Sequence, residues 1–297
     1  RRVAEKDFYF RRRLILAFSA HSHTQIRRTA DLTCTFAFHG PFAFPAVYSQ
    51  MRLILDLGNT RHKFAVYNGQ EFVSTGSEPH LTTGHVAHVI DTYAITESIV
   101  SSVDHHDDDL EALLEAETRL IRFNHQTPLP IMNLYGTPNT LGKDRLAGVV
   151  GARVAFPELP VLVIDAGTCI KYDFVDAQGG YYGGAIAPGL YMRLKAMHNF
   201  TARLPLIEPE NYTVLAEVPI TGNSTTDSMR SGALNGAVFE VEGAIAAYKQ
   251  LHPSLTVIIT GGDAGFFELH VKSRIFARPN LVLEGLNAIL NYNLTNH

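Results

Sequence analysis

The sequence predicts an α/β fold built from two copies of one unit, and three observations support that prediction. An alternating strand ends in an Asp-x-Gly turn at Asp56, and a second strand ends in the same way at Asp165. After each turn the chain returns as further β-rich segments, and helical segments follow them. Because this pattern recurs once, at a distance far longer than a short repeat, it indicates a duplicated domain rather than a solenoid.

The composition is that of an ordinary globular protein. Of 297 residues, 46% are hydrophobic and 18% are charged, which allows one large domain or two of ordinary size. The mean hydropathy is +0.02, and no apolar run in the sequence reaches the length of a membrane span. Cys34 and Cys169 lie far apart and have no metal or redox spacing. We therefore expect no disulfide framework and a reducing, cytoplasmic location.

Charge is distributed unevenly along the chain. Residues 1–50 hold 8 Lys and Arg against 3 Asp and Glu, a net charge of +5, so the remainder of a chain with net charge −4 carries −9. An acidic body lacks the basic surface that nucleic acids require, and we expect no nucleic-acid partner. An anionic substrate stays possible, because a site needs only local positive charge and backbone donors.

The first fifty residues differ in character from the rest. An arginine triplet followed by a short apolar run resembles a signal peptide, and the Arg- and Ser-rich, acid-poor composition resembles a transit peptide. Met51 is the first methionine and begins an alternating strand. We expect that Met51 is the true start and that residues 1–50 are a leader outside the fold. Two domains are then predicted, at 51–158 and 159–297.

Alternation and turn chemistry predict the strands, and apolar residues at helical spacing predict the helices. The Asn68-Gly69 pair is a strong hairpin signal, and the acids of residues 107–109 suit the positive end of a helix. Strands are predicted at 52–57, 63–67, 71–75, 98–103, 120–123, 160–165, 170–175, 181–187 and 255–260. Helices are predicted at 85–93, 107–117, 144–156, 226–251 and 281–293.

The first motif that carries chemistry runs from Asp56 to Lys63. A strand delivers the Asp56 carboxylate into a turn where Gly58 lets the backbone approach a phosphate closely. Turn N–H groups, the Thr60 hydroxyl and the Lys63 ammonium can then hold phosphoryl oxygens. Asp56 would act through Mg²⁺, which needs few protein carboxylates. Taken alone, the motif is explained equally well by a hairpin without a ligand.

The second motif, Asp165-Ala166-Gly167-Thr168, repeats the first at the end of another apolar strand. A carboxylate in such a place is costly unless it is paired or bound to a cation. Two such turns in a duplicated frame predict a cleft with a phosphate-binding hairpin on each side. Gly261-Gly262-Asp263, between a strand and a helix, fits either an adenosine-side loop or a helix start without a ligand.

The third motif, Gly142-Lys143-Asp144-Arg145, leads into a predicted helix. Asp144 has two interpretations. It is an acid that stabilises the helix start, as N-cap or in the first turn, or a general base that takes a proton from an alcohol attacking the γ-phosphoryl group. Arg145 can bind a carboxylate or steady the transferring charge.

Two further segments are rich in turn residues. The glycines of 183–189 mark a place where the backbone passes close to a substrate or to another chain. Ser224 and Thr225 precede a predicted helix, where a hydroxyl caps the helix and can also face a ligand. The sequence contains neither a Gly-x-x-x-x-Gly-Lys-Ser/Thr phosphate loop nor a Gly-x-Ser-x-Gly elbow.

In combination and order, these motifs resemble the type III pantothenate kinase family over nearly all of residues 51–297. They are Asp-x-Gly-Asn-Thr-x-x-Lys, Gly-x-Asp-Arg, Asp-Ala-Gly-Thr, Gly-Gly-x-Ile-x-Pro-Gly and Ser-Thr before a helix. The resemblance implies duplicated ribonuclease-H-like domains with an interdomain ATP cleft, as in actin-like ATPases and sugar kinases. It implies phosphorylation of the primary hydroxyl of pantothenate with ATP, the first step towards coenzyme A. It further implies a homodimer that needs Mg²⁺ and a monovalent cation, K⁺ or NH₄⁺.

Carried over by position, the resemblance assigns a role to each motif. Asp144 would be the catalytic proton acceptor, Asp165 would hold the monovalent cation, and Asp56 would hold Mg²⁺. The residues that would bind ATP are Asp56, Leu57, Gly58, Asn59, Thr60, Arg61, His62, Lys63 and Thr168. Those that would contact pantothenate are Tyr135, Gly142, Lys143, Asp144, Arg145 and Thr225. Cys169 stands where many relatives have a small residue, and we expect that difference to be tolerated.

Two other functions stay open at this point. A different kinase of the same fold, acting on a sugar or a small acid, would share the phosphate-binding hairpins. Only Tyr135, the segment 142–145 and Thr225 argue for pantothenate. The second alternative is a non-catalytic accessory factor for transcription, and the intact acidic motif residues and Lys63 argue against it.

Overall fold

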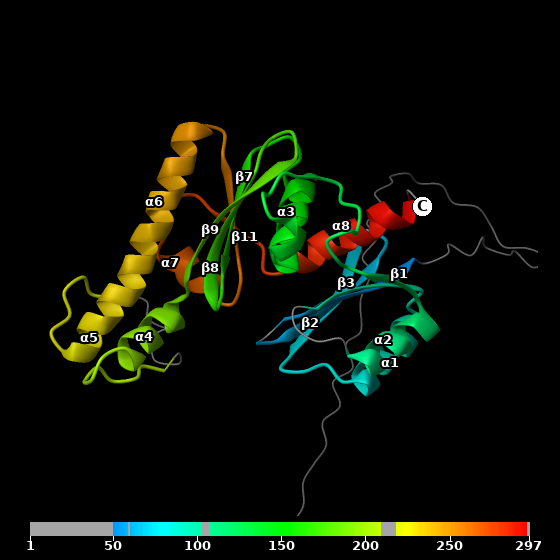
Figure 1. The fold of residues 1–297 in the computed structure, drawn as a ribbon, viewed down its shortest axis with the longest axis horizontal. Helices are drawn as coiled ribbons and strands as arrows, with labels where there is room; N and C mark the ends of the chain where they lie inside the picture. Colours follow the sequence, from blue (N-terminus) through cyan, green and yellow to red (C-terminus); the bar gives the residue numbers. More distant parts are fainter. Residues whose placement is uncertain (1–49, 59, 103–106, 209–217, 296–297) are drawn as a thin grey trace, which may run out of the picture. The chain divides into compact units, whose positions relative to one another are not determined.

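Nearly all of the chain after residue 49 is described by the computed structural model, whose fold is shown in Figure 1. The described residues are 50–58, 60–102, 107–208 and 218–295. They all belong to one unit that spans Val47–His297. The predicted leader, apart from Gln50, and the predicted ATP contact Asn59 lie outside the described residues. None of the described helices combines the length and the apolar character that crossing a membrane requires.

The first sheet has five strands in the order β3-β2-β1-β4-β5. β1, β2 and β3 pair antiparallel, while β4 and β5 run parallel to β1. The predicted turn after Asn68 joins β2 to β3, and Gly69 takes a positive φ of 59° there. The strands are β1 (Met51–Leu57), β2 (His62–Asn68), β3 (Glu71–Glu78), β4 (Glu97–Ser102) and β5 (Arg119–Arg122).

The second sheet repeats the first, strand for strand. Its order is β11-β10-β7-β8-β9-β6, with β7, β8 and β9 antiparallel and with β10 and β11 parallel to β7. Read from β9 to β11, this is the order and direction of β3 to β5, so the predicted duplicated ribonuclease-H-like fold is confirmed. The additional strand β6 pairs with β9. The strands are β6 (Met132–Asn133), β7 (Val161–Ala166), β8 (Cys169–Val175), β9 (Gly180–Pro188), β10 (Thr256–Thr260) and β11 (Phe276–Ala277).

The helices also occupy equivalent places in the two halves. α2 connects β4 to β5 as α7 connects β10 to β11, and α3 and α8 each come after the last of these strands. A short 3₁₀ turn at Pro138–Thr140 precedes α3. The helices are α1 (Thr83–Tyr93), α2 (Asp108–Glu117), α3 (Lys143–Ala155), α4 (Leu190–Asn199), α5 (Thr225–Arg230), α6 (Gly236–Leu251), α7 (Ala264–His270) and α8 (Leu281–Thr295).

The single long helix predicted at 226–251 is interrupted, and that prediction was wrong in this respect. Ser231–Asn235 is π-helical and separates α5 from α6. The Ser231 hydroxyl donates to the Ile220 carbonyl at 2.6 Å. A side chain that bonds to backbone outside the helix competes with the regular helical ladder, and a π turn is one way to accommodate it.

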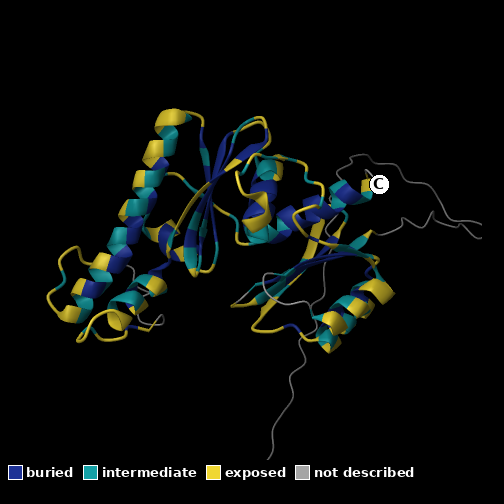
Figure 2. Ribbon diagram, viewed as in Figure 1, coloured by how far each residue is buried: buried dark blue, intermediate teal, exposed yellow. Residues whose placement is uncertain are grey.

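Three apolar cores hold the sheets and helices together. One lies between the first sheet and α1 and α2, and another lies between the second sheet and α4, α6 and α7. The middle core joins both sheets to α3 and α8, and Figure 2 colours much of α8 as buried. Ile54, Val163 and Leu286 are buried in this core. The predicted domain boundary between residues 158 and 159 stays a prediction, since this core contains residues from both sides of it.

α3 and α8 meet at unusually short range because each has a glycine at the contact. A Cβ atom at Gly285 would lie 1.7 Å from the Ala147 carbonyl oxygen, and one at Gly151 would lie 2.4 Å from the Leu281 carbonyl oxygen. Any side chain at either position would therefore push the helices apart. The contact fixes α3, whose first turn carries Asp144.

Candidate active site

A small pocket collects charged groups from both halves of the fold. Its volume is about 80 Å³, which suits an ion or the end of a phosphate chain and not a whole nucleotide. Its three carboxylates come from β1, α3 and β7, and its lysine comes from β2. The lining residues are Asp56, Lys63, Asp144, Asp165, Thr260, Gly261, Pro279, Asn280, Val282 and Leu283.

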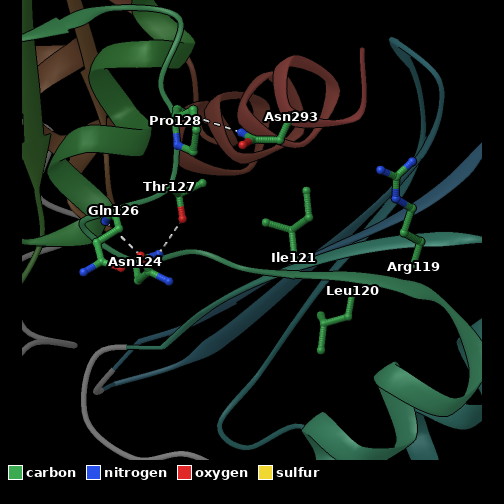
Figure 3. Close-up of a pocket in the computed structure, with 8 residues that line it drawn as sticks. All are labelled: Arg119, Leu120, Ile121, Asn124, Gln126, Thr127, Pro128 and Asn293. Carbon is green, nitrogen blue, oxygen red and sulfur yellow. Dashed lines mark hydrogen bonds between the residues drawn. The ribbon is translucent and has the colours of Figure 1, made fainter. Parts of the chain in front are cut away.

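A larger hollow of about 440 Å³ lies beside the edge strand β5 (Figure 3). Its polar groups bond to one another: Asn293 donates to the Pro128 carbonyl at 2.9 Å, and the Gln126 amide donates to Asn124 at 2.8 Å. It contains no carboxylate and none of the predicted site residues, so we place the chemistry in the smaller pocket. The hollow is lined by Arg119, Leu120, Ile121, Asn124, Gln126, Thr127, Pro128 and Asn293.

Asp56 and Lys63 face each other across the first hairpin. They are paired in register on the antiparallel strands β1 and β2. Burial raises the pKa of Asp56 from 3.8 to about 6; Asp144 adds to the rise and Lys63 opposes it. The ionised form of Asp56 is therefore disfavoured in this structure, and a bound cation would stabilise it.

Asp144 lies in the first turn of α3. The N-cap is Gly142, which offers no side chain to cap the helix. Asp144 is therefore an acid of the first turn and not the N-cap, and its role as a general base stays a prediction. The Oδ1 atom of Asp144 accepts a hydrogen bond from the Arg145 amide at 2.9 Å. A Cβ atom at Gly142 would lie 2.5 Å from that oxygen, so glycine there leaves room for the carboxylate.

Lys171 on β8 is a charged residue beside the pocket carboxylates that the sequence analysis missed. Its ammonium group lies 2.5 Å from Asp144 Oδ2 and 2.7 Å from Asp165 Oδ2. Burial lowers the pKa of Lys171, but the two carboxylates outweigh it and raise the pKa above its ordinary value. The duplication contained the signal, because Lys171 is paired with Asp165 as Lys63 is paired with Asp56.

Arg145 is committed to Asp173, a buried residue on β8. Its Nε and Nη2 atoms donate to Asp173 Oδ1 at 2.9 and 2.6 Å, and the Tyr181 hydroxyl donates to the same oxygen at 2.7 Å. The exposed fractions are 8% for Arg145 and 2% for Asp173. Arg145 therefore ties the start of α3 to the second sheet, and its contact with a substrate stays a prediction.

Tyr135 packs beside this ion pair. Its ring stacks on Tyr181 with centroids 6.2 Å apart, and the Arg145 Cζ atom lies 5.6 Å from its centroid. A Cβ atom at Gly183 would lie 2.6 Å from the Tyr135 ring, and Gly183 has a φ of 100°. Glycine is thus required there both for space and for backbone conformation.

The glycine-rich segment on β9 passes close to the chain's own backbone. A Cβ atom at Gly184 would lie 1.7 Å from the Tyr172 carbonyl oxygen, and one at Gly189 would lie 2.2 Å from the Gly167 carbonyl oxygen. The neighbour expected from sequence, a substrate or another chain, is at these two positions the β7–β8 hairpin itself.

The two predicted phosphate-binding turns approach each other. The hydroxyl oxygens of Thr60 and Thr168 are 3.5 Å apart, and both residues are exposed. The loop after β10 joins them, because the Asp263 amide donates to the Ala166 carbonyl at 2.9 Å. The duplicated frame therefore brings all three turns to one end of the sheets.

Several predicted site residues do not line the pocket with their side chains. Leu57 is 6% exposed and packs in the first apolar core. Arg61 donates to Ser77, with Nε 2.9 Å from its hydroxyl oxygen. His62 accepts from the Leu81 amide at 3.2 Å. Their backbone groups are therefore the better candidates for contact with a phosphate.

Two of the predicted substrate contacts, Lys143 and Thr225, each begin a helix, but only Lys143 lies next to Asp144. Lys143 is the first residue of α3 and is half-buried beside Asp144. Thr225 is the exposed first residue of α5, and the cap of that helix is Ser224, whose hydroxyl accepts from the Asp227 amide at 3.1 Å. Thr225 is not among the residues that line the pocket.

The donor set fits Mg²⁺ better than it fits a monovalent cation. No cluster of three or more His, Cys, Asp and Glu that could hold a metal occurs among the described residues. Mg²⁺ usually takes one or two protein carboxylates and completes its shell with phosphates and water, which Asp56 allows. The Asp165 carboxylate instead already accepts from Lys171, so a monovalent cation does not fit at that oxygen unless Lys171 moves.

Comparison with known proteins identifies the family of the chain. A family model described as type III pantothenate kinase matches residues 52–247. A type III pantothenate kinase of Bacteroides fragilis is 44% identical over 244 residues, which cover 82% of this chain and 98% of the relative. The chain belongs to the type III pantothenate kinase family. Another type III pantothenate kinase, from Christiangramia forsetii, is 41% identical over 249 residues, covering 82% of this chain and all of that relative. Membership in this kinase family implies ATP and a divalent metal ion.

A solved structure supports the fold. A conserved putative Baf family transcriptional activator from Campylobacter jejuni aligns with a TM-score of 0.53 over 82% of this chain and 99% of its own. Because the two sequences are only 19% identical, the likeness shows the shared fold and nothing about activity.

Proposed function

We propose that the protein transfers the γ-phosphoryl group of ATP to the primary hydroxyl of pantothenate, giving 4'-phosphopantothenate and ADP. This is the first step of coenzyme A biosynthesis, for which a cytoplasmic location is expected. The observation that carries the proposal is the pocket itself: three carboxylates and Lys63 line it, and Lys171 contacts two of those carboxylates, in a chain of this kinase family. The two alternatives from sequence share the fold but do not account for family membership.

Asp144 is the proton acceptor in this proposal. The pantothenate hydroxyl gives its proton to the Asp144 carboxylate as its oxygen attacks the γ-phosphorus, and ADP leaves from the opposite side. The rigid first turn of α3 orients the carboxylate, since Arg145 ties that turn to β8 and α8 packs against the helix. Positioning of this kind supplies much of the catalysis of phosphoryl transfer.

The ATP phosphates lie along the two turns. Asp56 would hold Mg²⁺, which when bound offsets negative charge on the phosphate oxygens. Lys63, opposite Asp56, adds a fixed positive charge, and the Thr60 and Thr168 hydroxyls face each other where phosphoryl oxygens would pass. We assign the backbone of Leu57, Gly58, Asn59, Arg61 and His62 to the same phosphates, although Asn59 is outside the described residues.

The pantothenate contacts are a proposal that rests on position alone. Gly142, Lys143 and Arg145 adjoin Asp144 along the chain, and the Tyr135 ring lies against Arg145. A substrate whose hydroxyl reaches Asp144 would pass beside them. Because Arg145 donates two hydrogen bonds to Asp173, we assign Arg145 chiefly to holding the start of α3 against β8. Thr225 keeps its assigned substrate contact as a prediction.

A homodimer is also part of the proposal. Four large apolar side chains are exposed on and after the edge strand β6 and on its neighbour β9, the exposed fractions being 52% for Met132, 50% for Leu134, 57% for Tyr182 and 61% for Ile186. A sheet edge with apolar side chains is suited to contact with a second chain. Light scattering of the full chain should give twice the monomer mass.

The substrate assignment is tested by ADP release from the full chain with ATP and Mg²⁺. We expect turnover with pantothenate, and none above background with a panel of sugars and small carboxylic acids. Turnover with a panel compound and not with pantothenate would keep the fold and refute the substrate. No turnover with any compound, in a folded protein, would favour the accessory-factor alternative.

Asp56→Asn is expected to stabilise the protein at neutral pH while abolishing activity. Because the pKa of Asp56 rises from 3.8 to about 6 on folding, folding stability falls as the pH rises through that window, where the unfolded chain loses its proton first. A difference of two pKa units lowers the free energy of unfolding by at most about 3 kcal/mol. The substitution leaves the four charged groups that act on Asp56 in place, those of Asp144, Asp165, Lys63 and Lys171.

Thermal unfolding of the parent and of Asp56→Asn, at about pH 4 and about pH 7, measures this effect. The gain should be present at the higher pH and nearly absent at the lower one. The exposed Asp91→Asn on α1 is the control and should show no such difference. An Asp56→Asn protein that is less stable than the parent at neutral pH would contradict the assignment.

A further inference from the structure

The ammonium group of Lys171 occupies the position between two carboxylates that belong to different elements. It lies 2.5 Å from Asp144 on α3 and 2.7 Å from Asp165 on β7. The side chain is 19% exposed, so its long stem is largely held by its surroundings. An ammonium group that is held between two carboxylates and is largely buried has a fixed position, unlike the cation of an exposed surface ion pair.

The duplication gives this lysine a counterpart. On the first hairpin Lys63 is paired with Asp56, and on the second Lys171 is paired with Asp165. Each half of the molecule thus delivers one carboxylate on its first strand and one ammonium on its second. Lys63 has a place in the proposed function, beside the phosphates, whereas Lys171 has none so far.

The pocket needs such a charge. Asp56, Asp144 and Asp165 all line a volume of about 80 Å³, and three like charges in so small a space repel one another. Lys171 contacts two of the three directly. It therefore supplies, as part of the chain, the single positive charge that a bound monovalent cation would supply beside Asp165.

We propose that the Lys171 ammonium is a built-in monovalent cation, which fixes Asp144 and Asp165 and makes phosphoryl transfer by this chain independent of added K⁺ or NH₄⁺. The inference rests on the proposed function and disagrees with one expectation from the sequence, the bound cation at Asp165. The contacts of the Lys171 ammonium are with Asp144 and Asp165, so we class it as a positioning residue that acts through these two carboxylates.

Two substitutions distinguish the effect of the positive charge of Lys171 from the effect of the space that its side chain fills. Lys171→Thr removes the ammonium and leaves room and an oxygen for a cation, and threonine suits a strand. Lys171→Met removes the charge but fills the same space with an apolar chain, so no cation can replace it. Lys272→Met, at an exposed lysine after α7, is the matched control.

The experiment measures initial rates of ADP release by the full chain with ATP, Mg²⁺ and pantothenate, in choline, potassium and ammonium chloride of equal ionic strength. The rates of the parent and of Lys272→Met should differ between the salts by less than about twofold, since screening is equal. The initial rate of Lys171→Thr in choline should be lower than that of the parent by about 10²-fold or more, the usual loss when one preorganised charge contact is removed. Potassium or ammonium should raise the rate of Lys171→Thr by at least about tenfold, while the rate of Lys171→Met should stay low in every salt.

Thermal unfolding midpoints in the same salts give a readout that does not depend on turnover. Only a ligand that binds the folded state raises the midpoint. The midpoint of Lys171→Thr should be higher in potassium than in choline, while those of the parent and of Lys171→Met should not differ between these salts.

The inference is overturned if the parent loses about tenfold or more of its rate in choline and recovers it in potassium. It is also overturned if Lys171→Thr shows neither a rate loss in choline nor a potassium-specific shift of its midpoint. If the parent phosphorylates nothing, the proposed function fails, and the midpoints alone still decide whether Lys171 stands in for a cation.

Discussion

Asp144→Asn is expected to lower kcat by about 10²- to 10⁴-fold, the usual contribution of a general base. The amide has nearly the shape of the carboxylate, but its single acceptor oxygen can keep only one of the two hydrogen bonds, that from Lys171 or that from the Arg145 amide. It also loses the capacity to take the proton of the attacking hydroxyl. KM for ATP should change little, because the turns that hold the phosphates are untouched.

The measurement is steady-state ADP release by the purified variant, together with its unfolding midpoint. Asp91→Asn, the same change on the exposed face of α1, serves as the control for the substitution itself. A folded Asp144→Asn protein with turnover near that of the parent would refute the role of Asp144 as the base.

Asp173→Ala is expected to lower the free energy of unfolding by about 3–5 kcal/mol, the usual result of removing one partner from a buried ion pair. The substitution leaves the Arg145 guanidinium, at 8% exposure, without its carboxylate and also removes the acceptor of the Tyr181 hydroxyl. The start of α3 then loses its tie to β8, so activity should fall as well.

Chemical denaturation of Asp173→Ala measures this loss. The surface ion pair between Arg122 and Glu115 offers a matched comparison, since both side chains are well exposed; Glu115→Ala should leave stability nearly unchanged. The double variant Arg145→Met with Asp173→Leu should regain much of the stability, because no buried charge is left alone. Equal stability of the parent and Asp173→Ala would contradict this account of the ion pair.

Local sequence patterns predicted the features that depend on neighbouring residues. The two Asp-x-Gly hairpins follow from strand alternation and turn chemistry, and the duplicated sheet follows from their recurrence. The first-turn position of Asp144 was one of two local options, and the structure decides it through the Gly142 cap. For the same reason the pocket residues Asp56, Lys63, Asp144 and Asp165 could all be named in advance.

Contacts between distant residues were beyond the sequence. Nothing near Arg145 indicates that Asp173, on another strand, takes up its guanidinium. The close approach of the β9 glycines to their own hairpin also depends on sheet pairing. Lys171 was missed for a different reason: its spacing from Asp165 differs by one residue from that of Lys63 and Asp56, so the match emerges only from strand register.

The most direct test of the central claim is mass spectrometry of the product that the full chain forms from ATP, Mg²⁺ and pantothenate. The account predicts 4'-phosphopantothenate in amounts equal to the ADP formed, and almost none of either with Asp144→Asn. ADP release without phosphorylated pantothenate would mean that the pocket hydrolyses ATP or uses another acceptor. That result would contradict the proposed function.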